Sequence, residues 1–258
     1  MSSLLSLRDI TVGYGDETII ENINIELGGG EFCALLGLNG SGKTTLLKAV
    51  CGLIPMRRGS CFVNGHDCTN LGERKRARYI SFIPQRHSIM QGVSVFDAVL
   101  MGFNPQLGLF EMPTNEHRGE AITILTKFGL SEYIYKDFST LSEGQQQLVI
   151  LARTLVQSAP VMLMDEPDSA LDFLNRHKMQ LRISDIIHYG NKAGIITLHD
   201  PNFALMYCDK IILLKDGRTV GEFSVKDSTR EHIEECLSQI YGDISIIEHK
   251  QKYIMLQE

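Results

Sequence analysis

The chain has 258 residues, of which 43% are hydrophobic and 22% charged, a composition typical of a globular protein with a substantial core. This composition excludes disordered, collagen-like and disulfide-scaffold proteins. The net charge of −6 and the pI near 5.8 argue against nucleic acid as a partner, because general nucleic-acid binders carry a basic surplus.

The cysteines and the apolar runs indicate the compartment. The six cysteines include no C-x-x-C pair and several lie within apolar runs, which favours free thiols in a reducing, cytoplasmic environment. No apolar run approaches the roughly 20 residues of a membrane span, and the N-terminus lacks the pattern of a signal peptide. Any role at a membrane is therefore expected from outside the bilayer.

The first part of the chain reads as strands around a glycine-rich loop. A short apolar strand over 5–12 ends at a turn that contains Tyr14, and a half-buried strand around 23–25 follows. Phe32–Leu36 is a continuous apolar run, as expected of a strand buried on both faces. The glycine-rich loop comes next, and a helix is predicted over 45–51.

The middle of the chain changes to helical periodicity. After a short strand at Ile80–Ile83, apolar residues recur at helical spacing in three segments, which are 95–101, 116–128 and 142–157. We predict that 95–157 forms a helical subdomain. It is inserted into a core made of 1–94 and 158–225, and the whole of 1–258 is expected to be one domain.

Strands resume after the helical segment. The apolar strands lie at 161–164, 194–198, 210–214 and 219–223, with a helix over 174–189 between the first two. Alternation of apolar strands with helices predicts an α/β fold with a mainly parallel sheet. The remaining segment, 226–258, reads as a helix over 229–240 and a hairpin that pairs 244–247 with 253–256.

The loop after the buried strand has the spacing of a phosphate-binding loop. It reads Gly37-Leu38-Asn39-Gly40-Ser41-Gly42-Lys43-Thr44, which matches G-x-x-x-x-G-K-[ST] between a strand and a helix. Backbone N–H groups of such a loop surround phosphate oxygens, Lys43 reaches the β- and γ-phosphates, and the Thr44 hydroxyl ligates Mg²⁺. The alternative, a tight turn with an incidental lysine, does not explain the flanking strand and helix.

Polar residues follow three of the predicted strands. Asp165 ends an apolar strand and is expected to hold Mg²⁺, and the adjacent Glu166 is expected to orient or deprotonate the attacking water. Gln85 and His199 each end another strand, and ligands of open α/β sheets bind beyond these strand ends. Gln85 is expected to sense Mg²⁺ and the water, and His199 to bond the γ-phosphate. Taken alone, Gln85 and His199 are each more typical of an ordinary polar residue at a loop entry, and only the combination of these residues favours a site.

A second helix start also has the features of an anion site. Ser142 and Gln145 form an S-x-x-Q capping box at the beginning of a predicted helix, with Gly144 between them. Such a helix start offers free N–H groups and a favourable dipole. Taken alone, the segment is a plain helix cap.

Together these segments resemble the ATP-binding cassette (ABC) family over nearly the full length. The phosphate loop is 37–45, including Thr45, and 141–145 is similar to the family signature. The segment 169–172, ending at Asp172, is similar to the D-loop, and His199 occupies the switch-histidine position. Tyr14 matches the aromatic residue that stacks on adenine. The resemblance implies a P-loop NTPase core with an N-terminal antiparallel β element and an inserted helical subdomain.

The resemblance also implies partners. Such domains form head-to-tail homodimers with each ATP held between the phosphate loop of one copy and the signature of the other, so Ser142, Gly144, Gln145 and Asp172 act in trans. The segments 99–105, 199–202 and 240–244 are similar to the importer branch for iron–siderophore, haem and cobalamin. In that branch the ATPase lies on the cytoplasmic face of the membrane, bound to a polytopic permease that receives cargo from an external binding protein.

Two departures from the family pattern leave alternatives open. Glu143 stands where glycine is usual in the signature, and Asp168 stands where threonine or serine is usual. We expect Glu143 to point away from the anion site, because an inward carboxylate repels the γ-phosphate. One alternative is a soluble ATPase of the same class that assembles iron–sulfur clusters. The other is a regulatory subunit that senses ATP without hydrolysing it.

Overall fold

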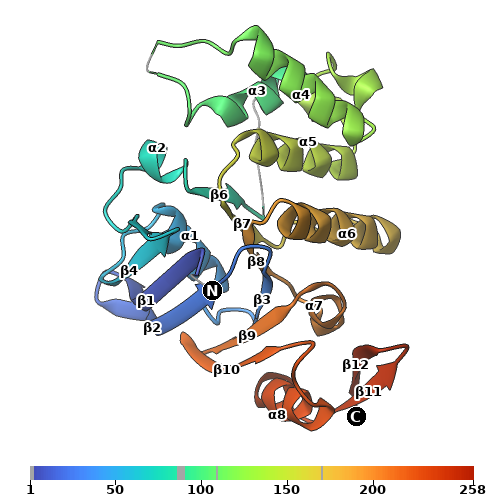
Figure 1. Cartoon of the computed structure of the whole chain (residues 1–258). Coiled ribbons are helices and arrows are strands. Elements are labelled where there is room, and N and C mark those ends of the chain that lie inside the picture. Colours follow the sequence, from blue (N-terminus) through green and yellow to red (C-terminus); the bar gives the residue numbers. More distant parts are fainter. Residues whose placement is uncertain (1–2, 86–90, 109, 170) are drawn as a thin grey trace.

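Three β-sheets and the helices around them make up the computed structural model, which describes residues 3–85, 91–108, 110–169 and 171–258 (Figure 1). The strands are β1 (Leu5–Tyr14), β2 (Glu17–Leu27), β3 (Phe32–Leu36), β4 (Arg58–Val63), β5 (His66–Asp67), β6 (Ile80–Ile83), β7 (Val161–Asp165), β8 (Ala193–Thr197), β9 (Lys210–Lys215), β10 (Arg218–Ser224), β11 (Ile244–His249) and β12 (Lys252–Gln257). The central sheet has the order β10-β9-β3-β8-β7-β6 and is parallel except at β10. The predicted α/β fold with a mainly parallel sheet is thus confirmed.

The N-terminal strands form a separate sheet of order β2-β1-β4-β5, and all its pairs are antiparallel. The implied antiparallel β element is therefore present. The last two strands pair with each other as the predicted hairpin, at the opposite end of the molecule from α3 and α4 in Figure 1.

Some of the α-helices pack against the central sheet, and others form a group beyond one end of it. The α-helices are α1 (Lys43–Cys51), α2 (Glu73–Arg76), α3 (Val95–Leu100), α4 (Asn115–Lys127), α5 (Glu143–Val156), α6 (Phe173–Tyr189), α7 (Pro201–Tyr207) and α8 (Arg230–Tyr241), and short 3-10 turns lie at Met101–Phe103, Ser131–Tyr133 and Phe138–Thr140. Helix α5 contacts both α3 and α4, and these helices stand together at the top of Figure 1. Within the described residues, no helix is both long and apolar enough to cross a bilayer.

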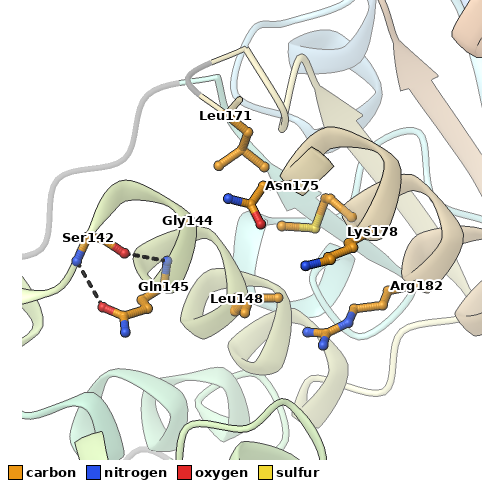
Figure 2. A pocket seen from close by; sticks show the side chains of 9 residues that line it. Ser142, Gly144, Gln145, Leu148, Leu171, Asn175, Lys178 and Arg182 are labelled. Carbon is orange, nitrogen blue, oxygen red and sulfur yellow. Dashed lines mark hydrogen bonds between the residues drawn. The ribbon is translucent and has the colours of Figure 1, made fainter. Parts of the chain in front are cut away.

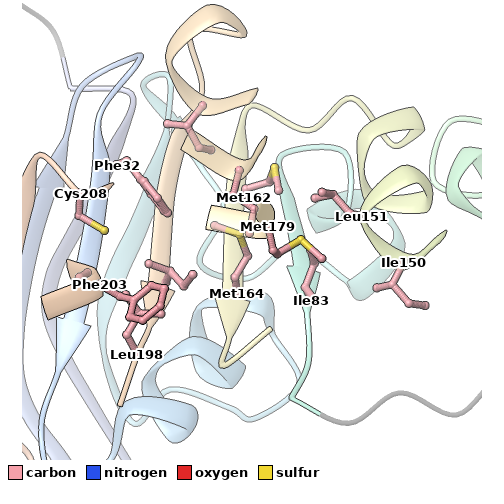
Figure 3. Close-up of a cluster of buried hydrophobic side chains, with 14 of the residues drawn as sticks. Phe32, Ile83, Ile150, Leu151, Met162, Met164, Met179, Leu198, Phe203 and Cys208 are labelled. Atoms are coloured by element: carbon pink, nitrogen blue, oxygen red, sulfur yellow. The ribbon is translucent and has the colours of Figure 1, made fainter. Parts of the chain in front are cut away.

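The hydrophobic core is divided between the two faces of the central sheet. On one face Phe32, Met162 and Met164 pack with side chains of the helices, including Leu151 of α5 (Figure 3). On the other face Cys33 and neighbouring strand residues pack against α1 and the N-terminal sheet. Strands buried on both faces are mostly apolar, which explains the uninterrupted apolar runs of β3 and of Val161–Met164 in β7.

Four short elements, β4, β5, α2 and α7, were not among the predicted ones. The strand β4 begins Arg-Gly-Ser and is held by antiparallel pairing with β1, which is a contact distant in sequence. Helix α7 has seven residues, too few for a clear helical period, and begins with Pro201 after the capping residue Asp200. The strand β4 therefore depends on a tertiary contact, and α7 depends on a short local cap.

Candidate nucleotide-binding site

The phosphate loop joins the end of β3 to the start of α1. The N-cap residue Gly42 has a positive φ of 98°, and no side chain caps the helix, so the N–H groups of the first turn face the loop. A Cβ on Gly37 would lie 2.3 Å from the carbonyl oxygen of Leu214, so this position accepts only glycine. The loop therefore presents backbone donors in the arrangement that the sequence predicted for binding phosphate.

Lys43 extends its ammonium group across the loop. Its Nζ donates to the carbonyl oxygens of Gly37 at 2.7 Å and Leu38 at 3.1 Å, and the residue is 6% exposed. Burial lowers the pKa of Lys43, and the negative charges of Glu166 and Asp165 act in the opposite direction. A buried cation held by backbone carbonyls is well placed to receive a phosphate.

Asp165 lies at the end of β7 directly beside the loop. Its Oδ1 accepts a hydrogen bond from Oγ1 of Thr44 at 3.0 Å and another from Oγ1 of Thr197 at 2.9 Å. Asp165 is 2% exposed. Carboxylate and hydroxyl oxygens are the donors that Mg²⁺ prefers, so the pair Thr44 and Asp165 fits a magnesium site.

Glu166 follows Asp165 in a left-handed backbone conformation with φ of 47°. This turn redirects the chain, and the Glu166 carboxylate Oε2 meets Nε2 of Gln85 at 2.5 Å and Nε2 of His199 at 2.7 Å. Gln85 and His199, which follow β6 and β8, thus converge on the carboxylate of Glu166, which follows β7. Such a constellation can orient a water molecule and accept its proton.

These groups surround a pocket of about 400 Å³. Its lining residues are Ile19, Asn39, Gly40, Ser41, Gly42, Lys43, Thr44, Thr45, Gln85, Glu166 and His199. Asp165 and Gly37 lie behind this lining, and Tyr14, 53% exposed at the end of β1, is not part of it. The structure therefore brings together every predicted residue of the loop and strand ends but leaves Tyr14 outside the pocket wall.

The signature-like segment lies at the start of α5 and lines a different cavity. Ser142 and Gln145 form the predicted capping box, in which the Ser142 N–H donates to Gln145 Oε1 at 3.0 Å and the Gln145 N–H donates to Ser142 Oγ at 3.4 Å (Figure 2). This cavity and the phosphate-loop pocket share no lining residue. Glu143 is exposed and lines neither, as expected.

The D-loop-like segment leads into α6. Asp172 caps that helix by accepting from the Asn175 N–H at 2.9 Å, and Ala170 lies outside the described residues. The unusual Asp168 is buried, and its carboxylate accepts from Nε2 of Gln180 at 3.0 Å. Asp168 thus anchors the segment after Glu166 to α6.

Sequence reasoning missed three side chains in or beside these cavities. Thr197 is 0% exposed and, besides bonding Asp165, accepts the Glu166 N–H at 2.9 Å. Lys178 and Arg182 of α6 line the cavity at the start of α5. The sequence offered two signals for them. Thr197 is a hydroxyl in an otherwise apolar strand, and Lys178 and Arg182 are cations four residues apart on a helix.

Comparison with known proteins agrees with this architecture. A family model described as ABC transporter matches residues 20–169. An uncharacterised ABC transporter ATP-binding protein of Methanocaldococcus jannaschii is 36% identical over 251 residues, covering 95% of this chain and 94% of that protein. A probable iron chelatin transport ATP-binding protein of Helicobacter pylori is 31% identical, covering 98% of each chain.

Solved structures show the same fold. A metal-chelate type ABC transporter in an inward-facing conformation superposes with a TM-score of 0.82 at 26% identity, covering 99% of this chain and 96% of that chain. A dimeric ATP-binding cassette bound to ADP and Pi has a TM-score of 0.75 at 26% identity, covering 87% and 100%. The chain therefore belongs to the ABC transporter family, as one of its ATP-binding, ATP-hydrolysing subunits.

Proposed function

We propose that this ATPase powers the import of a metal chelate of the iron–siderophore, haem or cobalamin class. It would act at the cytoplasmic face of the membrane, bound to a polytopic permease that takes cargo from an external binding protein. The observation that carries the ATPase role is the Glu166 carboxylate, held between Gln85 and His199 beside Lys43. The chelate class is supported by the name of the Helicobacter pylori relative and by the metal-chelate type transporter.

The pocket supplies the groups that phosphoryl transfer requires. Loop N–H groups and the Lys43 ammonium neutralise the β- and γ-phosphates, and Glu166 orients the attacking water and accepts its proton. His199 bonds the γ-phosphate. Mg²⁺, held by the Thr44 hydroxyl, the Asp165 carboxylate and the Gln85 amide oxygen, would supply further positive charge to the phosphates. Tyr14 would stack on adenine at the exposed edge of β1.

A head-to-tail dimer accounts for two phosphate-binding helix starts that line separate cavities within one chain. Each ATP would lie between the loop of one copy and Ser142, Gly144 and Gln145 of the other, with Asp172 at the same interface. The dimeric cassette bound to ADP and Pi supports this arrangement. Hydrolysis would open the dimer and move the permease.

The ATPase and dimer parts are tested on the Glu166→Gln variant. With MgATP, analytical ultracentrifugation should show a dimer that dissociates when ATP is removed, and phosphate release should be nearly absent. A strictly monomeric variant at saturating MgATP, even with its permease, contradicts the shared site.

The cargo is tested on the complete transporter. The ATPase is co-purified with its permease, reconstituted in vesicles with the external binding protein, and supplied with labelled ferric siderophore, haem or cobalamin. Uptake of one of these that needs ATP and stops in the Glu166→Gln complex supports the proposal. A complex that hydrolyses ATP but moves none of the three contradicts the cargo class while leaving the ATPase role standing.

A further inference from the structure

The C-terminal hairpin of β11 and β12 packs against α7 and α8, and these elements lie together in the lower part of Figure 1. At one rung of this hairpin, where Ile246 pairs with Met255, backbone groups of both strands point outward. The Met255 N–H donates to Oδ1 of Asn202 at 2.7 Å, and the Met255 carbonyl accepts from Nδ2 of Asn202 at 3.2 Å. The Ile246 N–H donates to Oε2 of Glu234 at 2.9 Å. Because Asn202 belongs to α7 and Glu234 to α8, this rung ties the two helices together.

Asn202 connects the hairpin to the start of α7. Besides the two side-chain bonds to Met255, the backbone N–H of Asn202 donates to Oδ1 of Asp200, the N-cap of that helix, at 2.9 Å. His199 directly precedes Asp200 in the sequence. The hairpin thus contacts the chain only three residues after His199, whose Nε2 lies 2.7 Å from Oε2 of Glu166.

Helix α7 depends on tertiary contacts for its position. It has seven residues, below the roughly 12 that an isolated helix needs to be stable, and it packs against α6, β3 and β12. The hairpin is itself anchored, because α8 packs against β9 and β10 of the central sheet as well as against β11. The chain before His199 is held by β8 and the chain after it by α7. Loss of the bonds between α7 and the hairpin should therefore shift the backbone on one side of His199.

We propose that Asn202 is a positioning residue for ATP hydrolysis, which holds His199 beside Glu166 through its bonds to the C-terminal hairpin. This inference rests on the role of His199 given under the proposed function. Neither Asn202 nor Met255 lines the phosphate-loop pocket, so Asn202 acts through the backbone that carries His199. Because a displacement of about 1 Å in a catalytic group can cost roughly 10²-fold in rate, loss of this support should lower kcat about tenfold or more.

The test variant is Asn202→Ala in the full chain, which removes both bonds to Met255 and keeps the backbone bond to Asp200. The matched control is Gln257→Ala. Gln257 is an amide of the same hairpin, but its Nε2 donates to the carbonyls of Tyr241 and Asp243 instead of to α7. Thermal unfolding shows whether each variant folds.

Asn202→Asp replaces the alanine variant where that protein does not fold. Its carboxylate keeps an acceptor for the Met255 N–H, and an acid in the first turn of α7 favours the helix dipole. It loses only the bond donated to the Met255 carbonyl, so the fall in kcat should be smaller but in the same direction.

Three measurements separate positioning from a general loss of structure. Phosphate release gives kcat, titration with fluorescent ADP gives the affinity of the phosphate loop, and NMR of ring-labelled histidine reports the surroundings of His199, whose signal is assigned by its loss in His199→Ala. We expect Asn202→Ala to lower kcat and shift the His199 signal, and to change ADP affinity by no more than about twofold, because the loop is untouched. Gln257→Ala should change none of the three.

A wild-type His199 signal in the folded Asn202 variant contradicts the proposal, and so does a shifted signal with wild-type kcat. An equal fall of kcat in Gln257→Ala also contradicts it, because the effect then belongs to the hairpin as a whole. A wild-type protein without ATP turnover would overturn the proposed function, and the His199 signal would still decide whether Asn202 holds that side chain.

Discussion

The buried hydroxyl of Thr197 donates a hydrogen bond of 2.9 Å to Oδ1 of Asp165. Oγ1 of Thr197 also accepts the backbone N–H of Glu166 at 2.9 Å, so one side chain of β8 fixes both acids at the end of β7. Because Thr197 does not line the pocket, it acts through Asp165 and Glu166 as a positioning residue.

Replacing Thr197 with valine should lower both stability and turnover. Valine preserves the shape but leaves the Glu166 N–H without a partner in a buried site, which costs about 1–3 kcal/mol of the free energy of unfolding. Displacement of the Glu166 carboxylate should also lower kcat. Urea unfolding and phosphate release measure the two effects. Thr197→Ser keeps the hydroxyl and should restore most of kcat, and equal loss in both variants would show that the hydroxyl has no positioning role.

Replacing Glu166 with glutamine should remove hydrolysis and retain ATP binding. Glutamine keeps the size of the side chain but cannot accept the proton of the attacking water, which is worth roughly 10²- to 10⁴-fold in rate. Phosphate release and nucleotide titration measure the two properties. The control is Glu132→Gln, the same change at an exposed carboxylate outside both cavities, which should hydrolyse ATP at the wild-type rate. Wild-type turnover in Glu166→Gln would mean that another group is the base.

The sequence predicted those parts of the site that depend on local pattern. The phosphate loop follows from glycine positions that need special backbone geometry, and the order of strands and helices follows from periodicity. The capping box of Ser142 and Gln145 is likewise local and is present in the structure. These features are encoded within a few residues of each other, which is why they can be read without tertiary information.

The remaining parts depend on contacts between distant segments. The convergence of Gln85, Glu166 and His199 was predicted only as nearness at the sheet edge, and the bonds between them require the strand order. The sequence alone marks Thr197 only as one residue of a buried strand, because its role depends on hydrogen bonds to Asp165 and Glu166. Lys178 and Arg182 became significant only once α6 was placed beside α5.

Replacing Lys43 with alanine should weaken nucleotide binding about 10- to 100-fold, the effect of losing one charge-assisted hydrogen bond to phosphate. The fold should survive, because burial of the Lys43 ammonium opposes its charged state and lowers its pKa, even though the charges of Glu166 and Asp165 act in the opposite direction. Fluorescent nucleotide titration measures affinity. Lys48→Ala, in the last turn of the same helix, is the control and should bind normally. Unchanged affinity in Lys43→Ala would contradict the loop assignment.

The thiol of Cys61 should make the protein less stable in alkali. Burial, with a smaller contribution from the nearby Cys68, raises the pKa of Cys61 from 9.0 to about 12, so the folded state retains a proton that the unfolded state loses. The stabilising contribution is complete below pH 9 and is lost as the pH rises toward 12, by up to about 1.4 kcal/mol per pH unit. Urea unfolding should be measured between pH 9.5 and pH 10.5, which lies between the two pKa values. Over this range the free energy of unfolding should fall more steeply for the wild type than for Cys61→Ala. Parallel curves for the two proteins would show that this thiol ionises equally in both states.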